Sequence, residues 1–218
     1  FIATGEQYLG TSPPEKSTAK TIFVNGLSRL GKTRAILRYL VTCVPPVIQH
    51  ERYEGKPLPL RQVTWLYVRV PKNASLKEFA LAFFEALDRV LDTSEYSKRA
   101  SRERGDLARL FSKVCREVQL GLLVVDELQN LLNARTQGKE SVQKFLHSLV
   151  DLVGIPVVFV GTYKAHGVFL GTLQETARIS GLANPELLRL DPSNDEWHVL
   201  VEAFWSCQWT TTPTPLDE

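Results

Sequence analysis

GLSRLGKT, at residues 26–33, matches the phosphate-binding loop pattern G-x-x-x-x-G-K-[ST]. The motif follows the apolar run Thr21-Ile22-Phe23-Val24 and precedes a helix-like stretch, Arg34 to Leu40. Glycines let a backbone curl so that successive N–H groups point at phosphate oxygens, and the dipole of a following helix favours an anion. A chance glycine turn between a strand and a helix is the alternative. The strand before the loop and the helix after it favour a nucleoside triphosphate site.

Each position of this loop has a predicted part in binding. Lys32 can reach the terminal phosphates, and the Thr33 hydroxyl suits a Mg2+ position. The other positions offer backbone N–H groups. The residues that we expect to hold the nucleotide are Gly26, Leu27, Ser28, Arg29, Leu30, Gly31, Lys32, Thr33 and Arg34.

A second apolar run, Leu120 to Val125, ends in the adjacent carboxylates Asp126 and Glu127, which is a Walker B pattern. An all-apolar run suits a central parallel strand, and ligands of open α/β sheets bind at the carboxyl ends of such strands. Asp126 would order Mg2+ through water, and Glu127 would polarise the water that attacks the terminal phosphoryl group. The alternative is an Asp-Glu helix cap, because acidic residues are common at helix starts.

Two further runs predict strands of the same sheet. Ile155 to Val160 leads into Gly161-Thr162, which makes Thr162 a candidate sensor of the γ-phosphate. Threonine is also an ordinary residue at a strand end, so the prediction depends on the order of the three motifs along the chain. The fourth strand is predicted at Val63 to Val70.

Helical patterns lie between these strands, at Ser75 to Leu91, Asp106 to Gln119 and Val142 to Val153. Alternation of strands and helices predicts an α/β fold with a parallel, doubly wound sheet and right-handed crossovers. Ser75 and Glu78 also fit a capping box at the start of the first of these helices.

Composition fits one sizeable core, since the chain has 218 residues of which 44% are hydrophobic. No apolar run reaches the roughly 20 residues that span a bilayer, and no secretory signal opens the sequence. We therefore expect a cytoplasmic protein without a membrane partner. Cys43, Cys115 and Cys207 are widely spaced, which favours reduced thiols and the ordinary reading of small buried apolar residues. The four histidines show no metal-ligand spacing.

The net charge is only +2, from 26 Lys and Arg against 24 Asp and Glu, and does not by itself indicate a nucleic acid partner. The distribution is more informative, because basic residues gather between Lys98 and Arg116 and again at Lys72 and Lys77. Such clusters can neutralise phosphates without reading bases. The alternative is a solvated helix face with i to i+4 ion pairs.

The chain begins at Phe1 and contains no methionine, so we expect it to be part of a longer protein, with residues omitted at some junctions between its segments. The segment from Thr210 to Glu218 contains Pro213 and Pro215 and is typical of a linker. Local motifs therefore carry more weight than the exact spacing between distant motifs.

Taken together, the motifs resemble the TnsC/TniB family of AAA+ ATPases, which regulate DNA transposition. The specific strings are VVDELQNL at residues 124–131 and GIPVVFVGT at residues 154–162. YVRVP at residues 67–71, the basic stretch before the Walker B strand, DEW at residues 195–197 and Gln208-Trp209 are also similar. The resemblance covers about residues 20 to 210, judged by the order of the motifs. It implies the ATPase core of a longer regulator of the TnsC type.

This resemblance implies an AAA+ P-loop NTPase fold, a parallel sheet flanked by helices with a small C-terminal helical lid. The expected parts are the nucleotide-binding core at residues 1–165, the lid region at 166–209 and a linker or tail at 210–218. It also implies ATP and Mg2+ as ligands, and subunits that assemble into a ring or helical filament on double-stranded DNA. The remaining partners would be transposase subunits and a target-selector protein, with ATP hydrolysis resetting or disassembling the complex.

In this family's class a neighbouring subunit supplies an arginine to the γ-phosphate. The candidates here are Arg178 and Arg189, and Arg178 is preferred because it follows the strand that ends at Thr162 by about one helix. Either arginine could instead act as a sensor in the same subunit or be a plain surface charge. The positions that match pore-facing, DNA-contacting segments are Lys72, Lys77, Lys98, Arg99 and Arg102, within a group that extends to Arg104.

Trp197, Val201, Phe204 and Trp205 repeat at intervals of three or four residues, which predicts one face of a helix. The spacing favours core packing of that face over a surface for stacking bases. Asp191-Pro192-Ser193-Asn194 would be the entry turn of the helix.

Two other functions remain open at this point. One is a different DNA-remodelling AAA+ module, such as a helicase loader or replication initiator. The other is a signalling NTPase or small-molecule kinase that needs no nucleic acid. A kinase requires a dedicated acceptor pocket and lid arginines, for which the sequence offers no convincing pattern.

Overall fold

The computed structural model describes residues 21–72, 75–103, 107–133, 154–165, 186–207 and 212. The chain divides into two compact units, Phe1–Leu187 and Leu188–Glu218. The first unit holds the sheet and the motifs that predict a nucleotide site.

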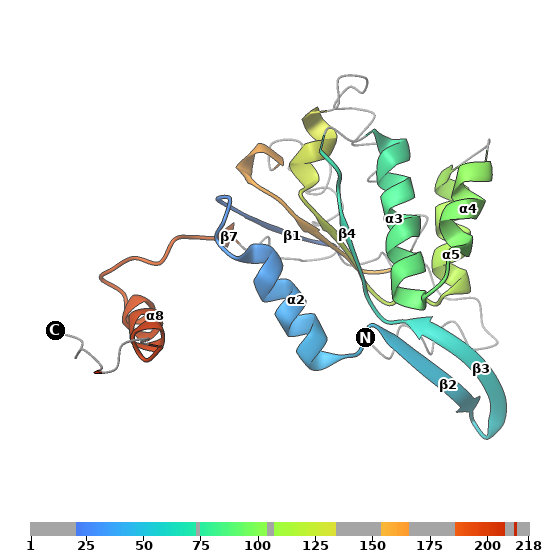
Figure 1. Cartoon of the computed structure of the whole chain (residues 1–218), viewed down its shortest axis with the longest axis horizontal. Coiled ribbons are helices and arrows are strands. Elements are labelled where there is room, and N and C mark those ends of the chain that lie inside the picture. Colours follow the sequence, from blue (N-terminus) through green and yellow to red (C-terminus); the bar gives the residue numbers. More distant parts are fainter. Residues whose placement is uncertain are drawn as a thin grey trace. The chain divides into compact units, whose positions relative to one another are not determined.

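Five parallel strands form the central sheet in the order β4-β5-β6-β1-β7 (Figure 1). Their bounds are Thr21–Gly26 for β1, Leu66–Arg69 for β4, Leu123–Asp126 for β5, Val157–Val160 for β6 and Glu186–Leu187 for β7. Parallel strands bring their carboxyl ends to one edge of a sheet. The predicted α/β fold of the P-loop NTPase type is therefore confirmed, and its motifs meet at a common edge.

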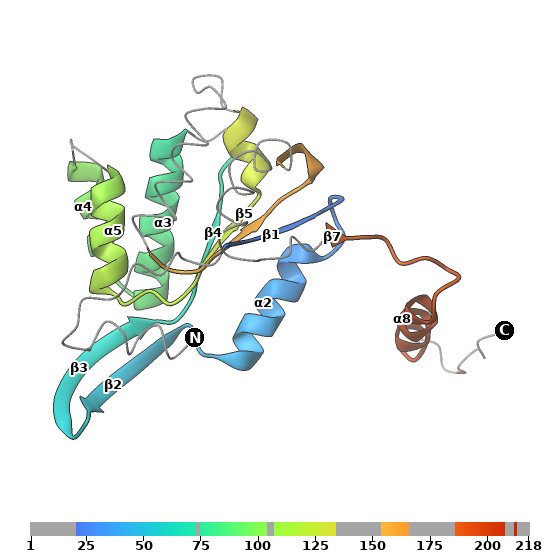
Figure 2. The same ribbon diagram turned by 180° about the vertical axis from the view of Figure 1, so that it is seen from behind.

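Helices cover both faces of this sheet, as Figure 1 and the reverse view in Figure 2 show. Helix α2, Lys32–Cys43, packs against one face, where Ile36, Leu37 and Leu40 contact a small cluster that includes Trp65 and Val124. Helices on both faces explain why the strands read as nearly continuous apolar runs, since neither face meets water.

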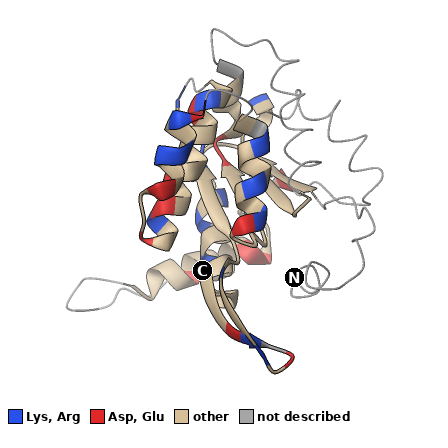
Figure 3. Ribbon diagram, turned by 90° about the vertical axis from the view of Figure 1, so that its right-hand side faces the viewer, with Lys and Arg blue, Asp and Glu red and all other residues tan. Residues whose placement is uncertain are grey.

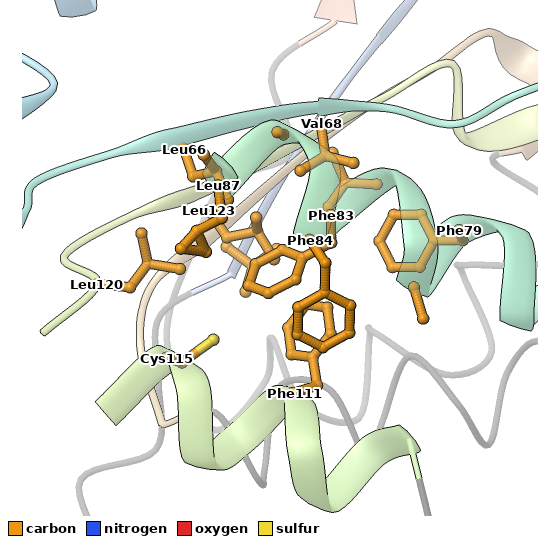
Figure 4. Packing of buried hydrophobic residues seen from close by; sticks show 14 of the residues in the cluster. Leu66, Val68, Phe79, Phe83, Phe84, Leu87, Phe111, Cys115, Leu120 and Leu123 are labelled. Atoms are coloured by element: carbon orange, nitrogen blue, oxygen red, sulfur yellow. The ribbon is translucent and has the colours of Figure 1, made fainter. Parts of the chain in front are cut away.

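The larger core lies on the other face, under α3, Leu76–Leu91, and α5, Leu107–Glu117. Phe79, Phe83 and Phe84 of α3 are fully buried and meet Phe111 of α5 (Figure 4). The ring centroids of Phe83 and Phe111 lie 3.7 Å apart in a stacked arrangement. Phe79 and Phe83 are four residues apart and share one face of α3, and Phe84 lies next to Phe83, so a single helix contributes three of the buried rings.

The predicted capping box at the start of α3 is confirmed. The Glu78 amide donates to the Ser75 hydroxyl oxygen at 3.3 Å, and the Ser75 amide donates to the Glu78 carboxylate at 2.6 Å. The carboxylate's bonds to the Ser75 amide and hydroxyl lower the pKa of Glu78. Two backbone donors that the helix itself cannot satisfy are thereby paired.

An antiparallel hairpin that the sequence did not predict follows α2. Strands β2, Val47–Tyr53, and β3, Lys56–Val63, pair with each other and extend away from the sheet at the end where α2 stops (Figure 1). Glu54 and Gly55 join them with φ angles of 47° and 78°. Positive φ at both central residues is the geometry of the type I′ turn that favours a two-residue hairpin.

The strand predicted at Val63 to Val70 is therefore wrong at its start. Val63 ends the hairpin strand β3, and the sheet strand β4 begins only at Leu66. The indole N–H of Trp65 donates to the Val44 carbonyl at 2.9 Å, and the Thr64 amide donates to the Pro46 carbonyl at 3.0 Å. These bonds tie the junction to the end of α2, so the chain changes partners within an unbroken apolar run.

The predicted helices correspond to α2, α3 and α5 within a few residues at their ends. Residues Val142 to Val153 lie outside the described part of the chain. A further helix, α4, occupies Glu95–Arg102, where the sequence indicated only a basic stretch. The backbone amides of Tyr96 and Ser97 in its first turn donate to the Asp88 carboxylate, each at 2.9 Å, so a buried acid of α3 caps the start of α4.

The second unit contains α8, Asp195–Trp205, preceded by the predicted turn. The Ser193 amide donates to the Asp191 carboxylate at 2.9 Å, and this bond is the main reason that the Asp191 pKa is lowered. The predicted burial of the aromatic face is wrong: α8 buries none of its residues, and Phe204 is 73% exposed. A unit of this size cannot build a core of its own.

The three cysteines are free thiols in different surroundings. Cys115 is buried, and burial raises its pKa well above the ordinary value, so the predicted role of a small apolar residue holds there. Cys43, the last residue of α2, and Cys207, two residues after α8, are exposed, so the same prediction is wrong for them. Among the described residues, no helix combines the length and the apolar character that crossing a membrane requires.

Gly26 is expected to tolerate no side chain. Its φ is 151°, and an added Cβ would lie 2.5 Å from the backbone carbonyl oxygen of Leu187 in β7. We expect Gly26→Ala to lower the free energy of unfolding by about 1–3 kcal/mol, since strain and the clash both oppose the native backbone. Urea unfolding followed by circular dichroism measures the change.

Gly55→Ala is the matched control for this substitution. Gly55 has a φ of 78°, but an added Cβ there meets nothing within 4 Å. We expect a cost of about 1 kcal/mol from the backbone conformation alone. Equal losses at the two glycines would contradict a specific clash between residue 26 and β7.

Candidate active site

One pocket of about 460 Å3 opens at the carboxyl edge of the sheet. Four segments that are distant in sequence line it: the loop into α2, the end of β4, the end of β5 and the end of β6. The lining residues are Ser28, Arg29, Leu30, Gly31, Lys32, Thr33, Arg34, Arg69, Asp126, Glu127, Gln129, Gly161 and Thr162. The sheet order explains this convergence, because β6 lies between β1 and β5 and all three strands end at the same edge.

The loop before α2 presents the amino end of a helix to this pocket. Arg29 and Gly31 have φ angles of 68° and 81°, which turn the backbone sharply into the helix. Gly31 is the N-cap, no side chain caps the first turn of α2, and no acidic residue lies in that turn. Uncapped N–H groups and the helix dipole favour an anion at this position.

Lys32 is the first residue of α2 and is only 8% exposed. Its ammonium donates to the carbonyl oxygens of Gly26 at 3.0 Å and Leu27 at 2.6 Å. Among the described residues it forms no ion pair with a carboxylate. A lysine ammonium has three protons and is rarely buried without a counter-charge, so a third, anionic partner suits the site.

Asp126 ends β5 and is the centre of the hydrogen bonds on the opposite wall. Its Oδ2 accepts from the Thr33 hydroxyl at 2.7 Å and from the Tyr67 hydroxyl at 2.8 Å. Its Oδ1 accepts from the Glu127 amide at 2.7 Å. Burial, followed by the bond to Asp126, raises the pKa of Tyr67 far above its usual range, so the phenol stays a donor. These three donors fix the carboxylate beside the Thr33 hydroxyl.

Glu127 follows in a left-handed conformation with a φ of 56°. Its Oε2 accepts from the Gln129 amide group, and its Oε1 lies 3.6 Å from the guanidinium of Arg69. The Gln129 side-chain oxygen in turn accepts from the Thr162 amide at 3.2 Å. The second carboxylate of the motif is therefore held between the ends of β4 and β6.

The charge of the pocket favours a polyanion. The charged lining residues are Arg29, Lys32, Arg34 and Arg69 on the positive side and Asp126 and Glu127 on the negative side. Four cations against two carboxylates leave an excess of two positive charges. A concave site with such an excess attracts phosphate groups.

A model of the family described as the bacterial TniB protein matches residues 7–187. The chain belongs to the TniB family. The predicted resemblance is thereby confirmed, and family membership makes the chain a transposition-related AAA+ NTPase. No curated protein sequence matches the chain.

The donor set of this TniB family member fits a magnesium ion. The Thr33 hydroxyl and the Asp126 carboxylate are 2.7 Å apart at the rim of a pocket with excess positive charge. Mg2+ prefers hydroxyl, carboxylate and phosphate oxygens, and it uses one or two carboxylates together with substrate phosphates. Among the described residues no group of three or more His, Cys, Asp or Glu forms an all-protein metal site.

The structure brings most of the predicted nucleotide residues together. Seven of the nine loop residues, from Ser28 to Arg34, line the pocket, and the other two, Gly26 and Leu27, offer their carbonyls to Lys32. Asp126, Glu127 and Thr162 line it as well. Arg178 lies outside the described residues, and Arg189 belongs to the second unit, Leu188–Glu218.

The residues that we predicted to contact DNA do not line this pocket. Lys72 follows β4, and Lys77 lies in the first turn of α3; both are exposed. Lys98, Arg99 and Arg102 lie on α4. The guanidinium of Arg99 forms a two-pronged ion pair with the Glu117 carboxylate of α5 at 3.0 Å, which raises the Arg99 pKa.

Sequence reasoning missed three residues that shape the site: Tyr67, Arg69 and Gln129. Tyr67 and Arg69 are the second and last residues of β4, at whose carboxyl end a parallel sheet places ligand contacts, so the strand prediction contained the signal. Gln129 stands two residues after the Walker B glutamate. Its amide contacts depend on the fold of the residues after β5, which no motif spacing specifies.

Removal of the Tyr67 hydroxyl is expected to weaken the fold measurably. Tyr67→Phe takes one of three donors from a carboxylate that is 4% exposed, and a bond to a charged group is worth more than a neutral one. We expect the free energy of unfolding to fall by about 1 kcal/mol, because two donors remain. Urea unfolding measures it.

Tyr39→Phe serves as the control, because Tyr39 lies on α2 and is 69% exposed. We expect that change to stay within about 0.5 kcal/mol of the unsubstituted protein. A Tyr67→Phe variant as stable as the Tyr39→Phe variant would show that the phenol contributes nothing to holding Asp126.

Proposed function

We propose that this chain is an ATP-dependent regulator of DNA transposition that binds ATP with Mg2+, assembles on double-stranded DNA and hydrolyses ATP to reset the assembly. One observation carries the proposal. Lys32 is a buried ammonium without a carboxylate partner among the described residues, and it lies in the same pocket as the Thr33–Asp126 pair and Glu127. A polyphosphate and a divalent cation satisfy both features.

Binding of the triphosphate falls to the loop and the start of α2. The backbone N–H groups from Ser28 to Arg34 would cradle the phosphate oxygens, and the remaining N–H of the Lys32 ammonium would donate a hydrogen bond to a terminal phosphate. Thr33 and Asp126 would hold Mg2+, which, when bound, neutralises developing charge on the phosphoryl oxygens. The hydrogen bonds from Tyr67 and from the Glu127 amide keep Asp126 oriented toward Thr33.

Hydrolysis is assigned to Glu127 acting on water. Its Oε2 is tied to Gln129, which leaves Oε1 on the side of Arg69 to orient a water and accept its proton. Thr162, at the end of β6 in the same pocket, would sense the γ-phosphate. In this scheme Lys32, Glu127 and Thr162 act from the subunit that holds the nucleotide.

A second subunit would complete the site with an arginine. Arg178 is the preferred residue for contact with the neighbour's γ-phosphate, and Arg189 is the alternative. Assembly into a ring or filament would then depend on ATP, because the nucleotide lies at the junction between subunits. The lid at residues 166–209, the linker or tail at 210–218 and a cytoplasmic location with the DNA belong to the same proposal.

Contact with duplex DNA is assigned to Lys72, Lys77 and the α4 residues Lys98, Arg99 and Arg102. Both basic and acidic residues lie on the helices of the face drawn in Figure 3. Lys98 lies 3.8 Å from Glu95, and Arg99 is paired with Glu117. Lys72, Lys77 and Arg102 form no ion pair among the described residues, so they are the cations of this group that give up least to contact a phosphate. Transposase subunits and a target selector would bind the assembled form.

A salt titration of DNA binding tests the proposal. Fluorescence anisotropy of a labelled duplex, with a non-hydrolysable ATP analogue and Mg2+, measures the affinity at several salt concentrations. Lys72→Ala and Lys77→Ala should each weaken binding and reduce the salt slope by about one. Lys56→Ala, at the exposed hairpin turn, is the matched control. Slopes that equal the control's would contradict these DNA contacts.

A further inference from the structure

Gln129 uses both ends of its side-chain amide within the candidate site. It lies in a short 3-10 helix, Leu128–Asn133, directly after the Walker B carboxylates. Its amide nitrogen donates to Oε2 of Glu127, and its amide oxygen accepts from the Thr162 backbone N–H at 3.2 Å. Only one orientation of the amide satisfies both partners, because a carboxylate needs a donor and an N–H needs an acceptor.

The slot that holds this amide is formed by the end of β6. A Cβ added at Gly161 would lie 3.3 Å from the Gln129 side-chain oxygen, 3.2 Å from the Ala165 side chain and 3.4 Å from the Phe23 ring. Glycine at position 161 therefore lets the amide approach the backbone of Thr162. The contact between the Gln129 amide and the Thr162 backbone therefore lies in a packed environment and does not join two exposed groups at the surface.

The other side chain that faces Glu127 cannot hold it as firmly. The Arg69 guanidinium lies 3.6 Å from Oε1, and the Arg69 side chain is 68% exposed, whereas that of Glu127 is 34% exposed. Exposed ion pairs of this kind contribute little, because water screens the charges and both side chains lose freedom. Gln129 is partly buried and makes the hydrogen bond that fixes one carboxylate oxygen.

We propose that Gln129 is a positioning residue that couples the Glu127 carboxylate to the Thr162 end of β6. The inference rests on the proposed function, in which Glu127 activates water and Thr162 senses the γ-phosphate. In this proposal Gln129 acts through Glu127, by setting where Oε1 of that carboxylate points. If the Thr162 backbone shifts toward a bound triphosphate, the Gln129 amide moves with it, because the two are hydrogen-bonded. The amide also binds Glu127, so the carboxylate moves together with the end of β6.

Gln129→Leu and Gln129→Glu separate the two ends of the amide. Leucine removes both contacts, while glutamate keeps an acceptor for Thr162 but replaces the donor to Glu127 with a second carboxylate. We expect kcat to fall at least about tenfold in both variants, the scale on which misplaced catalytic groups lose rate. The affinity for a fluorescent ADP, measured without turnover, should stay within about twofold, because the loop and Lys32 are unchanged.

Two controls distinguish positioning from loss of structure. Gln49→Leu makes the same substitution at an exposed position of β2 and should leave kcat unchanged. Thermal unfolding of each nucleotide-free variant shows whether the fold is retained. In the Glu127→Gln background, Gln129→Leu should reduce the residual single-turnover rate little further, because residues that act as a unit are not additive.

The outcomes separate this inference from the proposed function. Wild-type hydrolysis together with an unchanged kcat in both Gln129 variants overturns the coupling and leaves the ATPase assignment standing. A fall in kcat that is matched by lost ADP affinity and a lower melting temperature assigns Gln129 a structural part and also overturns the coupling. Absence of hydrolysis in the wild-type protein, with nucleotide and duplex DNA present, overturns both.

Discussion

Lys32→Ala is expected to lower the affinity for ATP at least about 100-fold. The ammonium is the buried cation nearest the loop carbonyls, and a charge-assisted hydrogen bond to a phosphate contributes about 1.5–3 kcal/mol. One such bond to a terminal phosphate, at the upper end of this range, accounts for the expected loss. Isothermal titration calorimetry with a non-hydrolysable ATP analogue and Mg2+ measures it directly.

Lys56→Ala is the control for this prediction, because Lys56 starts β3 and is exposed at the hairpin turn. It removes the same charge without touching the pocket and should bind the analogue as the wild type does. Far-ultraviolet circular dichroism should show a folded protein in both cases. A Lys32→Ala protein that binds as tightly as the control would contradict the assignment of the pocket to a triphosphate.

Glu127→Gln is expected to abolish most hydrolysis while nucleotide binding persists. Glutamine keeps an oxygen that accepts from Gln129, so the local contacts survive, but it cannot take a proton from water. General-base groups contribute about 100- to 10,000-fold to rate, and we expect kcat to fall within that range. The variant should therefore accumulate the ATP-bound assembly. Phosphate release and retained labelled ATP measure the two effects.

Glu85→Gln provides the comparison, since Glu85 is exposed on α3 and its loss should leave the rate unchanged. The two variants differ only in where a carboxylate becomes an amide. Hydrolysis by Glu127→Gln at the rate of the Glu85→Gln protein would remove Glu127 from the mechanism and return the Asp-Glu pair to the role of a helix cap.

The sheet could be predicted because its strands are apolar for a simple reason: helices cover both faces, so each strand reads as a continuous run. The site could be predicted because Lys32 and Asp126 each belong to a recognisable motif at the end of a strand. Parallel topology then brings those ends together, and this is why residues roughly a hundred positions apart line one pocket.

The hairpin escaped prediction for reasons that are visible in its sequence. Pro57 and Pro59 lie within β3, and proline argues against a central strand because it cannot donate to a ladder. The turn is Glu54-Gly55, which lacks the Asn-Gly signature of a type I′ turn. The strand β3 then runs directly into the residues before β4, so one apolar run conceals two strands with different partners.

The contacts of Gln129 and Tyr67 depend on tertiary structure. Tyr67 reaches Asp126 across neighbouring parallel strands, and Gln129 reaches Thr162 across a gap of 33 residues in sequence. No local pattern encodes either distance. The exposed face of α8 shows a related limit, since helical spacing predicts that residues share a face but does not predict whether that face is covered.

The most direct test of the proposed function is the mass of the assembly, measured by size-exclusion chromatography with light scattering. The samples would contain short duplex DNA alone, a non-hydrolysable ATP analogue with Mg2+ alone, and both together. The proposal predicts a large complex that forms only when nucleotide and DNA are both present. A nucleotide-bound monomer that is indifferent to DNA would contradict it and favour a signalling NTPase or a kinase.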